Sequence, residues 1–288
     1  MIWTIVSKAE MEGYKIPPVF QYYREVIGKE NISLAVVDED DPLDFVKPHD
    51  VILLRTASER LIESIERKGV ASTAESYSLY RQVQDKAGLG QFLWKYGVLV
   101  PYQFTLGKAT VNRRYFVKPR YGSESFGITP QCICNNQAEV AAQVERLYTE
   151  LGQESVIEEY VDGIDCTVAC YYDPLIKDVR AHAIKVECDE VGGIQTHVGK
   201  FDYNEYCSPL YGDDGRQARA ISRNVFRLLG IRHHARIDYR LSYDGRLYLI
   251  DVNLLPGLGP SAHFSKCLLL TENISYMDAI KSILKSSS

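Results

Sequence analysis

The first part of the chain shows two hydrophobic patterns, short apolar runs typical of strands and amphipathic stretches typical of helices. Short apolar runs predict strands at residues 2–6, 33–37 and 50–54, and amphipathic stretches predict helices at 19–27 and 58–68. The order strand, helix, strand, strand, helix is typical of an open α/β sheet. We therefore expect an amino-terminal α/β domain, which we place at residues 1–74.

The rest of the chain combines longer helical patterns with strands that follow one another directly. In chain order the pattern predicts a helix at 76–96, strands at 98–104 and 115–118, a helix at 137–151, strands at 156–161, 165–172 and 181–186, and a helix at 215–229. Residues 187–211 are polar, irregular and too long for an ordinary connection, so we expect a lid or a disordered segment there. The fold class is α/β, in part α+β, and we expect two α+β subdomains at 75–160 and 161–288.

A β-hairpin is the clearest local feature. Asp244-Gly245 separates two alternating runs, 234–241 and 246–253, and Asp-Gly between such runs is a strong hairpin signal. If these two residues form the loop, the register pairs Ile237 with Val252, Tyr239 with Ile250 and Leu241 with Tyr248 on one face, and Asp238 with Asp251 and Arg236 with Asn253 on the other. Because every pair on the first face is apolar, this register is consistent with one buried face.

Asp238 and Asp251 would repel each other in this arrangement. A shared proton, a nearby arginine or a metal ion could offset the repulsion. Asn253 stands on the same face, so three oxygen-bearing side chains converge, and this is the ligand set that Mg²⁺ takes together with phosphate oxygens and water. The alternative is a surface ladder of charges neutralised by Arg236 and Arg240.

A glycine-rich loop at 122–127 adds a second candidate site. Backbone N–H groups there, with the hydroxyls of Ser123 and Ser125, can surround phosphate oxygens, and Lys118 supplies a positive charge at the end of the preceding strand. The loop matches neither the P-loop nor the dinucleotide-binding pattern. Together with a magnesium site further along the chain, it indicates a nucleoside triphosphate.

Composition narrows the class of protein. The chain has 288 residues and a formal net charge of -5, so we expect it to bind neither nucleic acid nor membranes. We find no basic leader at its start and no apolar segment near the roughly 20 residues that cross a bilayer. Its 7 scattered cysteines fit reduced thiols better than a disulfide framework. We expect a cytoplasmic protein.

These motifs, in this order, resemble the ATP-grasp superfamily, and within it the carboxylate-amine ligases of the D-alanine–D-alanine ligase and ribosomal-protein glutamate ligase types. The resemblance runs from about residue 50 to 265 and rests on Asp85-Lys86, on 116–128, on 156–165, and on 235–239 with 250–257. It implies an ATP-grasp fold, in which an amino-terminal open α/β sheet domain precedes two α+β subdomains that sandwich ATP.

The resemblance also implies roles for particular residues. It places the phosphates of ATP against Lys86, Lys118, Ser123 and Ser125, with Lys200 as the substitute for a family lysine whose position is Tyr206 here. It places the adenine against Glu158 or the backbone around Glu159, Tyr160 and Val161, the ribose on Asp165, and Mg²⁺ or Mn²⁺ on Asp238, Asp251 and Asn253. Arg236 and the backbone N–H of Gly257 would be catalytic, because they would stabilise the oxyanion of the reaction.

The implied activity joins a small-molecule carboxylate to an amine through an acyl phosphate, with amino acids or a short peptide as substrates. A homodimer is a further implication of the resemblance. Two alternatives stay open, an ATP-grasp phosphotransferase (kinase) and a nucleotide-binding protein without chemistry. The chain lacks the Gly-Gly-x-Ser-x-Glu element with which D-alanine ligases bind their first substrate. His263 either contacts the substrate or is an ordinary surface histidine.

Overall fold

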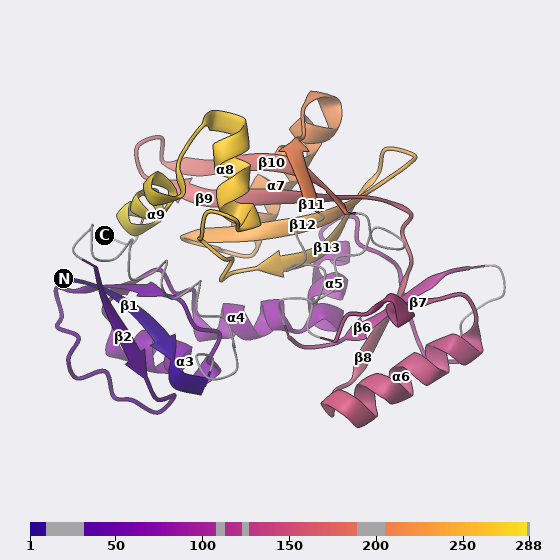
Figure 1. Ribbon diagram of the computed structural model, residues 1–288, viewed down its shortest axis with the longest axis horizontal. Helices are drawn as coiled ribbons and strands as arrows, with labels where there is room; N and C mark the ends of the chain where they lie inside the picture. The colour runs from indigo at the N-terminus through magenta and orange to yellow at the C-terminus, as the bar shows by residue number, and fades with distance from the viewer. Residues whose placement is uncertain (10–31, 108–112, 123–126, 189–204, 287–288) are drawn as a thin grey trace.

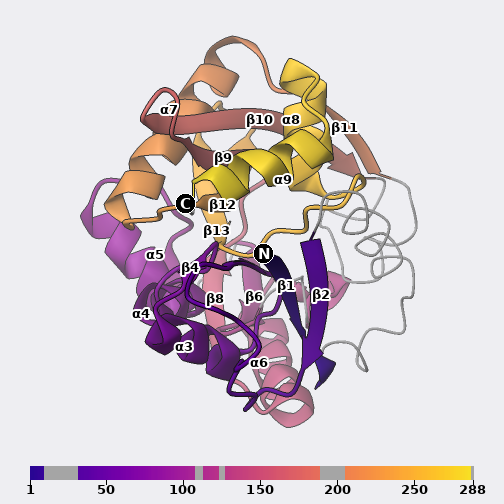
Figure 2. The ribbon, with the colours of Figure 1, turned by 90° about the vertical axis from the view of Figure 1, so that its left-hand side faces the viewer.

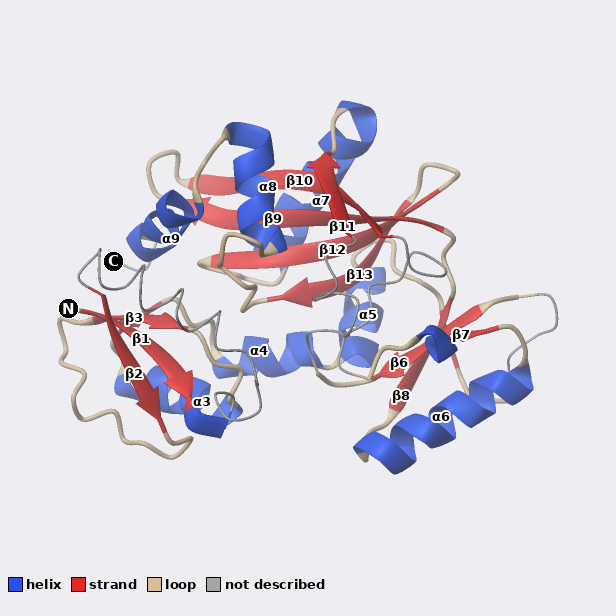
Figure 3. Ribbon diagram, in the orientation of Figure 1, coloured by secondary structure: helices blue, strands red, loops and turns tan. Residues whose placement is uncertain are grey.

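The computed structural model describes residues 1–9, 32–107, 113–122, 127–188 and 205–286. Its strands form three sheets, shown in red in Figure 3. In Figure 1 the amino-terminal sheet lies at the lower left, a small sheet at the lower right and a larger sheet above them. The helix expected at 19–27 lies outside the described residues.

The amino-terminal sheet is parallel, with the order β2-β1-β3-β4. Its elements are β1 Ile2–Ser7, β2 Ile32–Val37, β3 Val51–Leu54 and β4 Ala71–Ser72, with helix α3 at Glu59–Lys68. Helix α3 buries Leu61, Ile62 and Ile65 in one core with Ile5 and Ile52 of the strands. This arrangement confirms the open α/β sheet predicted for this part of the chain.

The small sheet has the order β5-β8-β6-β7 and is antiparallel. Its elements are β5 Gln103–Phe104, β6 Tyr115–Pro119, the 3₁₀ turn η1 Pro130–Cys132, β7 Ile133–Cys134, helix α6 Gln137–Leu151 and β8 Ser155–Glu159. Helix α6 has the predicted bounds because Asn136 caps its first turn through the N–H of Glu139, and Gly152 ends it in the left-handed conformation.

The large sheet has the order β11-β10-β9-β12-β13 and is antiparallel throughout. Its elements are β9 Gly163–Asp173, β10 Asp178–Cys188, β11 Glu205–Pro209, α7 Gly212–Leu228, β12 His234–Ser242, β13 Leu247–Asn253, α8 His263–Glu272 and α9 Tyr276–Lys285. Figure 2 shows α7 and α8 on opposite sides of this sheet. Alternate residues of β9 accordingly belong to two cores, Val168 to that of α7 and Ala169 to that of α8.

The single helix predicted at 76–96 is wrong, because two helices, α4 Tyr77–Gln84 and α5 Lys86–Lys95, meet at Asp85. The break does not fall at Gly88 or Gly90. The carboxylate of Asp85 accepts the backbone N–H of Gly88 and two bonds from Arg120, so Asp85 ends one helix and caps the next.

Two further predictions of secondary structure are corrected. Of the strand predicted at 98–104, only Gln103 and Phe104 form a β-strand. Pro101 has no N–H to donate, and the carbonyl of Leu99 accepts the N–H of Leu249 in the large sheet instead. Part of the segment expected to be irregular at 187–211 is strand β11, and residues 189–204 lie outside the described residues.

The hairpin register is correct at the charged end and wrong nearer the loop. Arg236, Ile237 and Asp238 pair with Asn253, Val252 and Asp251 as predicted. Tyr239 instead pairs with Leu249 and Leu241 with Leu247, so the predicted pairs Tyr239 with Ile250 and Leu241 with Tyr248 are wrong.

Two irregularities of the hairpin compensate for each other. The loop has one residue more than predicted, Tyr243 to Gly245, because the N–H of Ser242 donates to the carbonyl of Arg246. Gly245 has a φ of 83°, which glycine adopts without strain. A β-bulge between Asp238 and Tyr239 then leaves Ile250 as the extra residue of β13 and restores the register at Asp251.

No helix within the described parts of the chain is long and apolar enough to cross a membrane.

We predict that Tyr239→Phe destabilises the protein. The hydroxyl of Tyr239 lies 2.8 Å from that of Ser222 in the core, so its loss leaves a buried hydroxyl without this partner and lowers the free energy of unfolding by about 1–2 kcal/mol. Urea denaturation measures the change. Tyr243→Phe, at a position that is 80% exposed, is the control and leaves stability unchanged. Equal stability of the two variants would contradict the prediction.

Candidate active site

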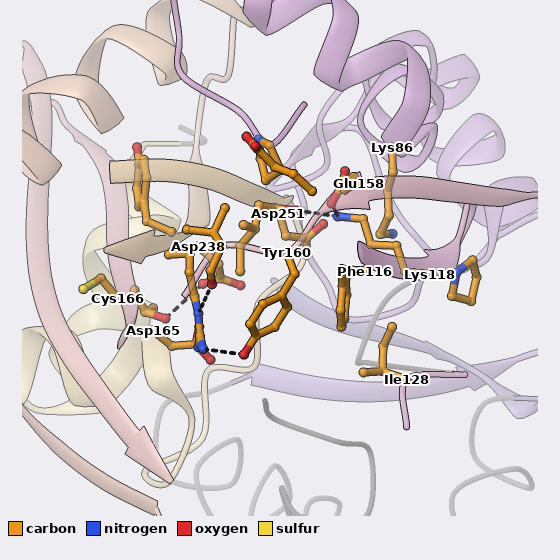
Figure 4. A pocket seen from close by; sticks show the side chains of 18 of the residues that line it. Lys86, Phe116, Lys118, Ile128, Glu158, Tyr160, Asp165, Cys166, Asp238 and Asp251 are labelled. Atoms are coloured by element: carbon orange, nitrogen blue, oxygen red, sulfur yellow. Dashed lines mark hydrogen bonds and ion pairs between the residues drawn. The ribbon is translucent and has the colours of Figure 1, made fainter. Parts of the chain in front are cut away.

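One cavity lies between the small and large sheets. Its lining includes Lys86 of α5, Phe116 and Lys118 of β6, residues 158–161 at the end of β8, Asp165 and Thr167 of β9, Arg236, Asp238 and Arg240 of β12, Asp251 of β13 and His263 of α8. Figure 4 shows Lys86 and Lys118 on one side, Asp165 and Asp238 on the other, and Asp251 and Tyr160 between them. The cavity therefore brings together most of the site residues expected from the sequence.

Asp238 and Asp251 face each other across β12 and β13, as predicted. Arg236 holds the carboxylate of Asp238 through Nε at 3.0 Å and Nη2 at 2.8 Å, and the hydroxyl of Thr167 donates to the same carboxylate at 3.0 Å. Burial acts to raise the pKa of Asp238, but these donors outweigh it and the pKa is lowered. Asp238 is therefore ionised at neutral pH, and the repulsion from Asp251 is offset in part by an arginine.

Asn253 lies two residues beyond Asp251 on β13, and Gly257 follows four residues later in the chain. Asn253 faces Arg236, and its Oδ1 accepts the N–H of Leu255 at 2.8 Å, which leaves the second lone pair of that oxygen for another partner. Gly257 is exposed and follows Pro256, whose carbonyl accepts a bond from Arg55 at 2.6 Å. Neither residue is among those lining the cavity, so their expected roles stay predictions.

Lys118 forms a buried ion pair with Glu158. Its Nζ lies 2.8 Å from the carboxylate, and the two side chains are 8% and 7% exposed. The ammonium also donates to the carbonyl of Ile250 at 3.2 Å. Ile250 is the bulged residue of β13, so the bulge aims a carbonyl at this lysine and joins the small sheet to the large one.

Lys86 begins helix α5, and its ammonium donates to the carbonyl of Gly122. Burial lowers the pKa of Lys86, Asp251 raises it, and Lys118 lowers it again, with a net decrease. Arg120 positions this helix start, since it binds Asp85 at 2.7 and 2.8 Å and Glu154 at 2.6 Å. The ion pairs of Arg120 therefore fix the first turn of α5, from which Lys86 reaches the cavity.

The segment between β8 and β9 is held by Arg240. This guanidinium donates to the carbonyl of Val161 at 3.1 Å, to Asp165 at 2.7 Å and to the hydroxyl of Tyr160 at 3.5 Å. Burial raises the pKa of Asp165, and the charge of Arg240 acts against that rise. Glu159 instead accepts the N–H of Tyr102 at 3.0 Å, away from this cluster.

The charged residues that line the cavity fit an anionic ligand that binds together with a metal cation. The described lining carries four fixed positive charges, on Lys86, Lys118, Arg236 and Arg240, and five carboxylates, on Glu158, Glu159, Asp165, Asp238 and Asp251, so the sum is 4 - 5 = -1. A triphosphate would need further positive charge in such a cavity. The facing oxygens of Asp238 and Asp251 are a donor set that fits a divalent ion.

Ser123, Ser125 and Lys200 lie outside the described residues. Sequence reasoning missed the contacts of Thr167, Arg120 and Arg240. The alternation of β9 could have placed Thr167 on the face of Asp165, but the partners of Arg120 lie 35 and 34 positions away along the chain, with no pattern linking them.

Comparison with known proteins identifies the family. Residues 107–285 match the family model described as "D-ala D-ala ligase C-terminus". The chain belongs to this family. The D-Ala–D-Ala ligase family includes two relatives of similar sequence, the D-alanine–D-alanine ligases of Nitratidesulfovibrio vulgaris, 26% identical over 62% of this chain, and of Cupriavidus metallidurans, 24% identical over 77%. The matches cover 59% and 69% of those two proteins.

Among the first three curated relatives, the chain spans only 50–59% of their lengths. Two solved structures share its fold: D-alanine–D-alanine ligase from Bacillus anthracis complexed with ATP, with a TM-score of 0.74, and VanG D-Ala:D-Ser ligase from Enterococcus faecalis, with a TM-score of 0.76. They are 17% and 13% identical and cover 99% and 100% of this chain, and the matches span 96% and 99% of their own chains. The ATP-grasp fold expected for the D-Ala–D-Ala ligase family is thereby confirmed.

We predict that Lys118→Met is strongly destabilising. The change leaves the carboxylate of Glu158 buried without its cation and lowers the free energy of unfolding by about 3 kcal/mol. Adding Glu158→Met removes that stranded charge and regains more than half of the loss. Urea denaturation of both single variants and the double variant measures this coupling.

Arg216→Met is the matched control, because Arg216 pairs with Asp213 on the exposed surface of α7 and its loss costs less than about 1 kcal/mol. If the losses in free energy of unfolding of Lys118→Met and Glu158→Met simply add in the double variant, the predicted coupling is wrong.

Proposed function

We propose that the protein is an ATP-dependent carboxylate-amine ligase that forms an amide or peptide bond through an acyl phosphate. The observation that carries this proposal is the facing pair Asp238 and Asp251 in a cavity that Lys86 and Lys118 also line. Membership of the D-Ala–D-Ala ligase family supports it. The three sheets are proposed as the cores of three domains, with the predicted boundaries.

In this proposal Lys86 and Lys118 bind the phosphates of ATP, residues 158–161 the adenine, and Asp165 the ribose. Asp238, Asp251 and Asn253 hold Mg²⁺, and Mn²⁺ suits the same oxygen donors. The bound ion supplies charge neutralisation for the transferring phosphoryl group. Lys118 already has Glu158 as a partner, so this lysine is positioned before nucleotide arrives.

The reaction proceeds in two steps. The carboxylate of the first substrate attacks the γ-phosphorus of ATP, and ADP leaves, which gives an acyl phosphate. The amine then attacks the acyl carbon, the C–O bond to phosphate breaks, and phosphate leaves with the electron pair. Arg236 uses Nε and Nη2 on Asp238, and its remaining N–H groups stabilise the tetrahedral oxyanion together with the N–H of Gly257.

The substrates are proposed as a small carboxylic acid and a small amine, such as amino acids or a short peptide. The names of the relatives favour D-alanine, whereas the missing Gly-Gly-x-Ser-x-Glu element favours a different first substrate. We propose a cytoplasmic setting, and the free thiols of Cys132, Cys134, Cys166, Cys170, Cys207 and Cys267 support a reducing compartment.

The test is the release of ADP and phosphate from ATP and Mg²⁺ across single amino acids and pairs, with mass detection of products. We expect release that depends on a pair, and a product lighter by one water than the sum of its parts. A phosphorylated acceptor without free phosphate would instead identify a phosphotransferase.

Asp251→Asn tests the metal assignment. We expect it to lower the rate of ADP release by about 100-fold or more, because the facing carboxylate that holds the ion is lost. Asp244→Asn, in the exposed loop of the same hairpin, is the control and keeps the full rate. Full activity of Asp251→Asn would rule out the assignment.

A further inference from the structure

His263 lines the cavity, and the proposed function assigns it no role. It is the first residue of α8 and lines the cavity together with Arg236, Asp238 and Thr167. Its side chain is 10% exposed, so it is not an ordinary surface histidine. Asp165 also lines this cavity, so the imidazole shares the cavity wall with two of the carboxylates of the site.

A carboxylate fixes the imidazole from the side of strand β11. Nε2 of His263 lies 2.5 Å from Oε1 of Glu205, whose side chain is 15% exposed. The ammonium of Lys266 lies 3.0 Å from the same oxygen. Burial acts to raise the pKa of Glu205, but His263 and Lys266 outweigh it and the pKa is lowered, so Glu205 stays ionised.

The bond to Glu205 decides which ring nitrogen can do chemistry. An ionised carboxylate only accepts hydrogen bonds, so Nε2 carries a proton. Nδ1 is then the nitrogen that can take a second proton, and the ring lines the cavity. A histidine oriented by a carboxylate in this way is a common proton acceptor in enzymes.

The other charges near the imidazole come from several elements. Lys266 lies on its own helix, Glu205 and Cys207 on β11, Asp165 on β9, and Arg236 and Asp238 on β12. Lys185 and Glu187 of β10 pair with each other at 3.1 Å. They alternate with Ile184 and Val186, which pack in the core of α8, so they belong to the opposite face of the sheet.

We propose that His263, positioned by Glu205, is the general base that takes the proton from the attacking amine. The inference rests on the proposed ligase function and adds the proton acceptor which that function requires. An amine substrate is largely protonated at neutral pH and cannot attack until it loses a proton.

The proton balance of this step is complete. The ammonium gives one proton to Nδ1 of His263, and the freed lone pair of the amine forms the C–N bond while the carbonyl pair moves to oxygen. When the tetrahedral intermediate collapses, the C–O bond to phosphate breaks. The leaving phosphate takes the electron pair and the second N–H proton, and His263 returns its proton to water.

A metal site made of Glu205, Cys207 and His263 is the competing interpretation, since ligand atoms of the three lie within 4.8 Å of one another. Two observations disfavour it. The ammonium of Lys266 lies 3.0 Å from Glu205 and 3.7 Å from the sulfur of Cys207, where a cation would bind. Burial, with Glu205, raises the pKa of Cys207 to about 12, whereas metals bind the thiolate.

The experiment compares two nucleophiles in the wild type and in His263→Gln, which keeps an N–H for Glu205 but has no basic nitrogen. Hydroxylamine is neutral at pH 7 and captures an acyl phosphate as a hydroxamate without needing a base. The carboxylic acid that gives hydroxamate in the wild type is then paired with D-alanine and the other amino acids to measure amide formation.

We expect His263→Gln to form hydroxamate within about twofold of the wild-type rate and to lose about 100-fold in amide formation at pH 7. The loss shrinks as the pH rises, because a larger fraction of the amine is then already deprotonated. Glu205→Gln keeps the imidazole but removes the ionised acceptor that orients it, so we expect amide formation to fall while hydroxamate formation stays near the wild-type rate. His49→Gln, at an 81% exposed position, changes neither reaction.

Four other results would contradict the proposed role of His263, and each points to a different explanation. Equal losses of hydroxamate and amide would show a structural role, and unchanged amide formation in His263→Gln would show no role in catalysis. Zn²⁺ retained through dialysis by the wild type but not by Cys207→Ser would establish the metal site instead. A wild type that uses no ATP with any acid and hydroxylamine would refute the ligase function itself.

Discussion

The site depends on one unfavourable arrangement, two carboxylates held directly opposite each other on neighbouring strands. Asp238 and Asp251 repel each other, and this repulsion destabilises the hairpin unless neighbouring groups offset it. Arg236 and Thr167 donate hydrogen bonds to Asp238. Lys86 lines the same cavity as Asp251, and the charge of Asp251 acts against the burial that lowers the pKa of this lysine. Because the two carboxylates repel each other, a divalent ion that binds their oxygens would be stabilised between them.

The two faces of the large sheet have different roles: one carries the charged residues of the site, and the other packs in the hydrophobic core. Asp165, Asp238 and Arg240 occupy alternate positions of β9 and β12, whereas Cys166, Ile237 and Tyr239 between them are buried in the core that α7 covers. The bulge at Ile250 keeps Asp251 on the charged face and turns a carbonyl toward Lys118. One irregular residue therefore links the sheet that carries the carboxylates to the sheet that carries the lysine.

The sequence was sufficient for features set by local pattern. Alternation along the hairpin placed Asp238 opposite Asp251, and the amphipathic pattern of residues 137–151 gave the bounds of α6. The register between Tyr239 and the loop was wrong because loop length and bulge changed together, and an alternating pattern does not reveal paired changes of one residue. The break at Asp85 and the ion pair of Lys118 with Glu158 depend on partners brought near by folding, which periodicity does not encode.

The most direct test of the account is a crystal structure with a nonhydrolysable ATP analogue and Mn²⁺, in which anomalous scattering locates the ion. We expect an anomalous peak between the carboxylates of Asp238 and Asp251, with the phosphates of the analogue near Lys86 and Lys118. Nucleotide bound elsewhere, or an ion at Glu205, Cys207 and His263 with none between the two aspartates, would contradict it.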